Sequence, residues 1–299
     1  MNLSHLFSHK KVVYSFEVFP PKKTSSVDTI YNTLLGLRGM PVDFISVTYG
    51  AGGSSIQKNK TCEIASLIKS EYQIEPVSHL TCVGSTKEEI METLYHLKQN
   101  GIQNILALRG DITPETQCKN DFHHASDLVS FIRTYDPSFN VIGACYPEGH
   151  CDASSLDEDI EHLKRKVDAG VTHLVTQLFF DNEHFYRFHE KLLKAGIDLP
   201  IEAGIMPIIN KRQIERTVTM CGASIPNKFS KLLNKYADDP QALHDAGISY
   251  ATDQIVDLIS NDVRGIHLYT MNNVDTARRI TENIRSIVAA CNRTSPSSN

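Results

Sequence analysis

Short hydrophobic runs rich in β-branched and aromatic residues alternate with longer stretches of helical period along the whole chain. Eight runs predict strands, at residues 12–19, 43–48, 76–82, 104–109, 140–145, 173–178, 201–206 and 265–270. The stretches between and after them predict helices near 27–38, 57–71, 87–99, 124–134, 155–169, 183–195, 211–221, 240–260 and 274–290. Three of these helices follow a candidate capping residue, namely Asp181, Asn210 or Asn272. The alternation indicates an α/β fold with a parallel sheet.

The spacing of the strands favours a closed barrel. Strand starts lie roughly 27–37 residues apart through the seventh, about one βα repeat, and only the last gap is longer. Eight such units in 299 residues fit a (β/α)8 TIM barrel better than a doubly wound sheet. We therefore predict one barrel domain over residues 1–291, with an extra helix or two between residues 222 and 262, before the last strand. Residues 292–299 are too polar to pack and predict a disordered tail.

Composition narrows the ligand class. The 30 basic and 35 acidic residues give a net charge of −5, and without a dense Lys/Arg block there is no electrostatic footprint for nucleic acid. No apolar stretch is long enough for a membrane span or a signal peptide, which predicts a cytoplasmic protein with no membrane partner. The 7 scattered cysteines form no CxxC pair, so we expect reduced thiols and no metal site. Small molecules are the expected ligands.

Polar residues gather where the predicted strands end, which in a barrel is where catalytic groups lie. Glu17 sits among phenylalanines, where poor solvation favours the protonated form and suits a general acid; an ion pair with Arg109 or a lysine explains it equally well. His79, taken alone, is most simply a core histidine. Gln177 lies beside apolar residues and needs hydrogen-bond partners, of which a ligand is one source.

Three further segments could bind phosphate but carry weak signals. The glycine-rich residues 50–54 could cradle an anion with backbone N–H groups, although a plain βα turn explains them better. Arg109, Gly110 and Asp111 offer a cation with an acid beside it, which a surface salt bridge explains nearly as well. Residues 164–166 form a basic run after Asp159. The preferred interpretation is a solvated helix face, and the second is a clamp for pyrophosphate.

Taken in order, the strand ends resemble the flavin-dependent methylenetetrahydrofolate reductases. The matching segments are residues 15–21, 47–54 (VTYGAGGS), 79–82, 107–111, 146–150, 163–170, 176–181, 204–207 and 267–272. The resemblance implies a (β/α)8 barrel with noncovalent FAD at the carboxyl ends of its strands. By position, the implied FAD contacts are Thr48, Tyr49, Ala51, His79, Arg109, Gly110, Asp111, Ala125, Tyr146, His150, Ala153, Asp159, His162, Arg165 and Lys166.

The same resemblance implies a ping-pong reaction, in which NADH reduces the flavin and 5,10-methylenetetrahydrofolate then accepts the hydride, giving 5-methyltetrahydrofolate for methionine synthesis. Glu17 is the implied proton donor that opens the folate ring, and Asp111 is implied to lie near flavin and pterin. Gln177 and Thr48 are implied to contact nicotinamide. Substrate contacts are implied for Glu17, Asp111, Gln177, Gln213 and Asn273.

Three positions depart from the family pattern as bacterial members show it. Thr217 stands where an aromatic ring is usual, Asn273 where an arginine is, and His162 where an asparagine is. The first two affect the preference for NADH or NADPH and the affinity for the folate tail, and they leave open a partner protein as electron donor. A barrel lyase would need a Schiff-base lysine at a strand end, where the sequence has none; a noncatalytic folate- or flavin-binding subunit is the other alternative. We also expect a homo-oligomer.

Overall fold

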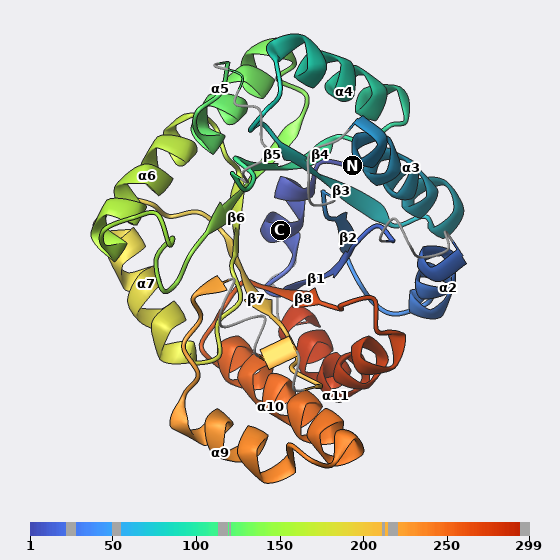
Figure 1. The fold of residues 1–299 in the computed structure, drawn as a ribbon, viewed down its shortest axis with the longest axis vertical. Helices are drawn as coiled ribbons and strands as arrows, with labels where there is room; N and C mark the ends of the chain where they lie inside the picture. The colour runs from blue at the N-terminus through green and yellow to red at the C-terminus, as the bar shows by residue number, and fades with distance from the viewer. Residues whose placement is uncertain are drawn as a thin grey trace.

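The computed structural model describes residues 1–21, 28–49, 55–112, 119, 121–210, 213–214 and 221–293. Its eight parallel strands close into a barrel in sequence order, which confirms the predicted (β/α)8 fold (Figure 1). Each strand lies within one to two residues of its predicted bounds. The strands are β1 (Val13–Val18), β2 (Phe44–Val47), β3 (Glu75–Thr81), β4 (Asn104–Leu108), β5 (Asn140–Cys145), β6 (His173–Thr176), β7 (Ile201–Ile205) and β8 (Gly265–Tyr269).

Helices surround the barrel and cover the outer face of its strands (Figure 1). The outer helices within the described residues are α2 (Asp28–Leu37), α3 (Ser55–Tyr72), α4 (Lys87–Gln99), α5 (Ala125–Tyr135), α6 (Leu156–Asp168), α7 (Asn182–Lys194), α9 (Asn227–Tyr236), α10 (Pro240–Ser260) and α11 (Val274–Arg293). Helix α9 confirms the extra helix predicted before the last strand. The predicted helix at 211–221 falls mostly outside the described residues.

Alternation along the strands divides each one between two environments. In β1, Tyr14, Phe16 and Val18 belong to the large apolar cluster between barrel and helices, whereas Val13 belongs to a separate cluster inside the barrel. Ser15 and Glu17 share the parity of Val13 and therefore point inward too. Parity thus places polar side chains of β1 in the barrel interior.

A short N-terminal segment closes the end of the barrel where the strands begin. It consists of a 3-10 turn, η1 (Leu3–His5), and one helical turn, α1 (Leu6–His9), which lie across the centre of the ring in Figure 1. Leu3 and Phe7 pack on the inward residues of β1 to β6, and the backbone N–H of Leu3 donates to Oδ1 of Asn104 at 3.1 Å. The sequence analysis did not predict this segment, which leaves the carboxyl ends of the strands as the open end.

The capping predictions are partly confirmed. Asp181 caps α7 as predicted, but the cap of α11 is Asn273, whose Oδ1 accepts from the backbone N–H of Thr276 at 3.0 Å. Asn272, the predicted cap, instead makes two hydrogen bonds with the backbone of Phe19, at 3.1 and 2.9 Å. The reason is geometric, since Asn272 adopts a left-handed φ of 55° and so lies one residue too early to cap.

The end of α11 corrects the predicted start of the tail. Asn292 and Arg293 lie in the helix rather than in a disordered segment. Oδ1 of Asn292 accepts from the backbone N–H groups of Lys11 and Val12, at 3.0 and 2.9 Å, and its amide donates to the carbonyl of Val12 at 2.9 Å. A polar side chain is ordered here because it satisfies the backbone just before β1. Residues 294–299 lie outside the described part.

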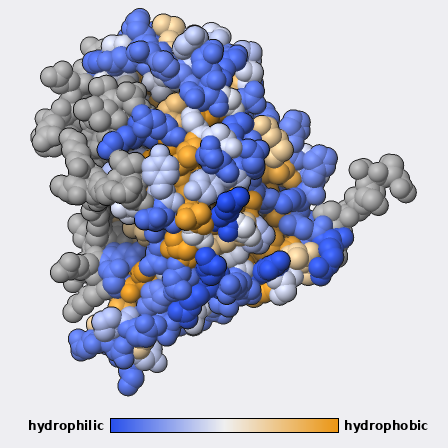
Figure 2. Space-filling view, turned by 90° about the vertical axis from the view of Figure 1, so that its right-hand side faces the viewer, coloured by the Kyte–Doolittle hydropathy of each residue, from blue (hydrophilic) through white to orange (hydrophobic). Residues whose placement is uncertain are grey.

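In the side view of Figure 2, hydrophilic side chains cover most of the face, and hydrophobic ones show in seams between them. No helix among the described residues is long and apolar enough to cross a membrane.

Candidate active site

Glu17, at the carboxyl end of β1, lies between two histidines. Its Oε2 is 3.4 Å from Nε2 of His79 on β3 and 3.5 Å from Nε2 of His267 on β8. The Glu17 side chain is 16% exposed, whereas His79 and His267 are buried. The carboxyl group is therefore reachable from the open end of the barrel while its inner side is enclosed. The ion pair with Arg109 or lysine considered from the sequence is not formed among the described residues.

His79 is held in its neutral form. Burial lowers its pKa from 6.5 to about 4, which outweighs the opposite effect of the nearby Glu17 carboxylate. Its buried Nε2 forms no hydrogen bond within the described part of the chain. A buried nitrogen of this kind is normally satisfied, so it is a candidate contact for a ligand.

The turn after β4 carries Arg109, Gly110 and Asp111. Gly110 has a φ of +89°, and a Cβ there would lie 2.8 Å from Cγ1 of Val83, so the turn requires glycine. The Arg109 guanidinium donates to Asp152 at 2.7 Å and is half-buried. Asp111 is exposed at the barrel mouth. The turn therefore presents a cation and a separate carboxylate side by side.

The end of β5 and the helix after it form a second buried polar group. The Lys166 ammonium donates to the carbonyl of Ala144 and lies 6.0 Å from the ring centre of Tyr146. Burial lowers the pKa of Lys166 and raises that of Asp159, whose carboxylate accepts from the backbone N–H of His150 at 3.3 Å. Lys166 is thus less exposed than the predicted solvated helix face requires, because it reaches back onto the strand.

The remaining implied FAD positions differ in accessibility. Tyr49 and Thr48 are half-buried after β2, Ala125 begins α5, and Ala153 is half-buried before α6. Like Asp111, His162 and Arg165 on α6 are exposed. Ala51 and Thr217 lie outside the described residues.

Three amide residues implied to contact ligands already have backbone partners. Oε1 of Gln177 accepts from the N–H of the next residue at 2.9 Å, which leaves its amide nitrogen for another acceptor. Gln213 uses both ends of its amide on the loop after β7, at 3.1 and 3.0 Å. Asn273 is the cap of α11. Gln177 and Asn273 thus each keep an amide nitrogen for a ligand, whereas Gln213 uses both ends of its amide.

Four buried polar residues of the barrel interior were missed as functional candidates in the sequence analysis: Ser15, His173, Glu202 and His267. Their signal was available, since a polar residue with inward parity on a barrel strand must find a partner inside. Glu202, between Ile201 and Ala203, is the clearest case. The identity of each partner, however, depends on the register between strands.

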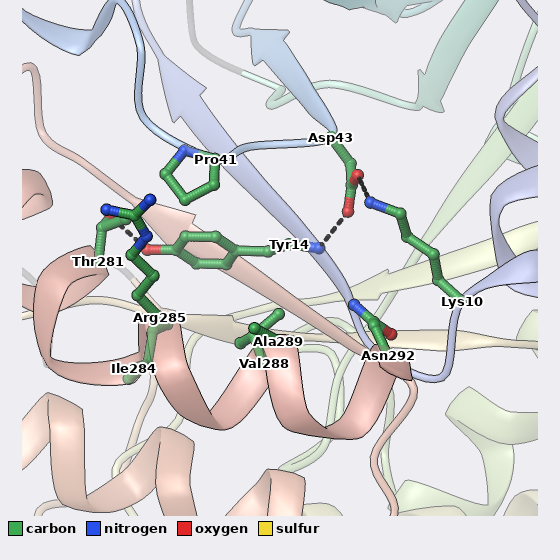
Figure 3. A pocket seen from close by; sticks show the side chains of 10 residues that line it. All are labelled: Lys10, Tyr14, Pro41, Asp43, Thr281, Ile284, Arg285, Val288, Ala289 and Asn292. Atoms are coloured by element: carbon green, nitrogen blue, oxygen red, sulfur yellow. Dashed lines mark hydrogen bonds and ion pairs between the residues drawn. The ribbon is translucent and has the colours of Figure 1, made fainter. Parts of the chain in front are cut away.

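A cavity of about 210 Å³ lies elsewhere, beside α11 and the start of β1 (Figure 3). Tyr14 crosses it and bonds its hydroxyl to Thr281 at 3.0 Å, while the Asp43 carboxylate pairs with Lys10 and accepts from the Tyr14 N–H. It contains none of the predicted site residues and lies where the strands begin. The candidate site is therefore the opposite end of the barrel.

The barrel mouth fits a large anionic cofactor beside a proton donor. Arg109 and Lys166 are cations suited to a diphosphate, and Nε2 of His79, which forms no hydrogen bond within the described residues, faces the Glu17 carboxyl group. His150, Cys151 and Asp152 also bring possible metal ligands within 4.8 Å of one another. Asp152 is already paired with Arg109, and Nδ1 of His150 already accepts from the Asp152 N–H at 3.1 Å. The donor set thus favours an organic anion.

Comparison with known proteins gives a consistent family. The family model described as methylenetetrahydrofolate reductase matches residues 2–285. The 5,10-methylenetetrahydrofolate reductases of Pectobacterium carotovorum and Escherichia coli are 34% and 35% identical; the alignments cover 90% and 89% of this chain and 89% and 88% of those relatives. Methylenetetrahydrofolate reductase 1 of Schizosaccharomyces pombe is 37% identical over 92% of this chain but only 46% of its own length. The chain therefore spans about half of the yeast relative and most of the bacterial ones.

A solved structure supports the fold independently. An uncharacterized protein from Clostridium thermocellum, described as binding two copies of 5-methyl-5,6,7,8-tetrahydrofolic acid, superposes with a TM-score of 0.67 over 97% of this chain and 100% of that one. Its sequence is 13% identical, so the likeness concerns the barrel alone.

Proposed function

Because this chain belongs to the methylenetetrahydrofolate reductase family, we propose that it reduces 5,10-methylenetetrahydrofolate to 5-methyltetrahydrofolate at the carboxyl end of its barrel. Family membership makes it an oxidoreductase of one-carbon metabolism. In this proposal the cofactor is noncovalent FAD and the electron donor is NADH. The protein works in the cytoplasm, and its product supplies methyl groups for methionine synthesis. The chemistry that FAD supplies when bound is hydride transfer in two half-reactions, from NADH first and to the folate second.

The observation that carries the proposal is the placement of Glu17. A reductase of this substrate must protonate a ring nitrogen of the folate so that the five-membered ring opens and its carbon becomes electrophilic. Glu17 is 16% exposed at the mouth, and its inner oxygen lies 3.4 Å from the imidazole of His79 and 3.5 Å from that of His267. A carboxyl group that is enclosed on one side and reachable on the other suits a general acid.

The other residues of the mouth take positioning roles in the proposal. Arg109 and Lys166 would hold the cofactor diphosphate by charge-assisted hydrogen bonds. Asp111, exposed beside Arg109, would bind the pterin, and the free amide nitrogen of Gln177 would orient whichever substrate occupies the site. Gln213 and Asn273 would act mainly through the loops that they hold.

The first test is an absorbance spectrum of the purified protein, followed by anaerobic NADH and then methylenetetrahydrofolate. We expect a flavin spectrum that bleaches with NADH and returns with the folate. Flavin that NADH fails to bleach would leave the fold and cofactor intact and point to a partner protein as donor. A protein that takes up no FAD would refute the proposal.

Glu17→Gln separates the two half-reactions. The amide keeps the size of the side chain but has no acidic proton, so we expect bleaching by NADH to stay near the wild-type rate while the return with folate is lost, by roughly 10²–10⁴-fold. Equal loss in both half-reactions would contradict the role of Glu17 as proton donor.

A further inference from the structure

A continuous row of buried polar side chains leads from Glu17 into the barrel. The hydroxyl of Ser15 donates to Oε2 of Glu202 at 2.6 Å and lies 2.7 Å from Nδ1 of His267. Nε2 of the same His267 ring faces Oε2 of Glu17 at 3.5 Å. The row crosses three adjacent strands, because Ser15 pairs with His267 between β1 and β8, and Gly204 pairs with His267 between β7 and β8.

The barrel makes room for the carboxyl group at the inner end of this row. Glu202 on β7 is 0% exposed. Its neighbour across the strands is Gly265, and a Cβ at that position would lie 2.5 Å from Cγ of Glu202. Phe7 of the N-terminal segment lies against His173, with ring centres 5.0 Å apart, and Nε2 of His173 faces Oε1 of Glu202 at 3.4 Å. Solvent is thereby excluded from the inner end.

Counting hydrogens shows that the row has two satisfied arrangements in which His267 is neutral. Ser15 has one hydroxyl hydrogen, so it donates either to Glu202 or to Nδ1 of His267. If Glu202 is ionised, Ser15 donates to it, His267 carries its hydrogen on Nδ1, and the bare Nε2 accepts a proton held by Glu17. If Glu202 is protonated, it donates to Ser15, Ser15 donates to Nδ1, and Nε2–H donates to an ionised Glu17.

The two arrangements contain the same number of hydrogens. Passing from the second to the first, Glu202 gives its proton to Ser15, Ser15 gives its own to Nδ1, and Nε2 gives its own to Glu17. The net change is one proton moved from Glu202 to Glu17, with no other atom or charge exchanged. The same hydrogens could also place both protons of the ring on His267 between two carboxylates, but that arrangement puts three charges instead of one in a buried row, which is costly.

We propose that Glu17 and Glu202 share one proton through Ser15 and His267, so that the buried Glu202 is a positioning residue that keeps a proton available to Glu17. Only the catalytic role of the shared proton rests on the proposed function, because the sharing itself is a property of the protein without ligands. It gives the barrel interior a role in supplying the proton that opens the folate ring.

The other groups facing this row do not supply the proton. His79 faces Glu17 from β3 and is neutral, because burial lowers its pKa to about 4. The Tyr269 hydroxyl donates to the carbonyl of Thr176 at 2.7 Å, and burial raises its pKa well above the ordinary value. Ser46 approaches Nε2 of His267 at 3.4 Å but is not titratable in this range. His173 faces the far oxygen of Glu202 and lies beyond the path to Glu17.

The test follows the carbonyl stretch of protonated carboxylic acid by infrared difference spectroscopy, on the full-length protein without substrates, as the pH is raised. In the wild type we expect a protonated-carboxyl signal that persists through neutral pH, because losing the shared proton would create two carboxylates on one row. In Glu202→Gln the signal should be lost at lower pH, by roughly one unit or more. An unchanged midpoint in Glu202→Gln, or no such signal in the wild type at neutral pH, would overturn the proposal.

Two further variants locate the path. Ser15→Ala interrupts the row between two intact carboxyls, so its titration should resemble that of Glu202→Gln, and adding Glu202→Gln to it should change little. A wild-type midpoint in Ser15→Ala would show that the carboxyls interact without Ser15. Tyr14→Phe is the matched control, since it removes a buried hydrogen bond from the adjacent residue on the opposite face of β1 and should leave the midpoint unchanged.

A kinetic readout then connects the row to the reaction. In the folate half-reaction, the pH at which the rate declines should move down in Glu202→Gln by the same amount as the infrared midpoint, while KM for the folate stays constant. An infrared shift in a protein that reduces no folate would support the shared proton and refute the proposed function. Folate reduction with identical pH profiles in wild type and Glu202→Gln would support the proposed function and refute the role of the shared proton in it.

Discussion

Phe7 tests whether the N-terminal segment belongs to the cooperative unit of the barrel. Its ring is 5% exposed, it packs with the innermost apolar residues of six strands, and the Arg264 guanidinium lies 5.9 Å from its centre. Replacing a buried phenylalanine with alanine removes its burial and leaves a cavity, at a cost of about 3–5 kcal/mol. We therefore expect Phe7→Ala to lower the free energy of unfolding by that amount.

The assay is equilibrium unfolding in urea followed by circular dichroism, with the slope of the transition determined for each variant. Phe7→Leu keeps most of the volume and should cost less than about 1.5 kcal/mol. Tyr95→Ala, at a ring that is 55% exposed, should stay within roughly 0.5 kcal/mol of the wild type. A loss below about 1 kcal/mol in Phe7→Ala would show that the segment undocks separately and that the barrel does not depend on it.

Two further predictions concern pH and helix capping. Burial lowers the pKa of His79 from 6.5 to about 4, so its contribution to stability is complete above pH 6.5 and decreases, by roughly 3 kcal/mol, as the pH falls towards 4. His79→Gln should flatten this part of the curve of unfolding free energy against pH, and parallel curves would contradict the assignment. Asn273→Ala should cost about 1 kcal/mol because it removes the cap of α11, whereas Asn273→Ser should restore most of it; equal losses in thermal melts would exclude capping as the cause.

The strands were predictable because most of their residues are buried on both faces of the barrel wall, so each reads as a short run rich in apolar residues between helical stretches. β5 was predicted to the residue, and β6 ends two residues early because Gln177 turns its amide onto the next backbone N–H. The segment containing η1 and α1 was not predictable from hydrophobic periodicity. Each of the two elements is a single turn with one buried side chain, Leu3 or Phe7, which is too short to show a repeat. Its place depends on the barrel that it closes.

The polar interior was only half predictable. Glu17 was found from its phenylalanine neighbours, but its histidine partners come from β3 and β8, far away in the sequence. Glu202 on β7 contacts Ser15 on β1 only because β1 and β8 pair and so close the barrel, which the sequence pattern does not show at the level of single residues. Lys166 was interpreted as part of a solvated face because spacing on a helix does not show how far a flexible side chain reaches back.

The bonds made by Asn292 determine where additional polypeptide would leave the molecule. Its amide holds the last turn of α11 against the residues before β1, beside the cavity of Figure 3. The chain therefore leaves α11 at Arg293 next to the closed base of the barrel, at the end opposite the mouth. A fused tag or module at that point would leave ligand entry unobstructed, and a module meant to control the reaction would have to reach around the outer helices or act through the base.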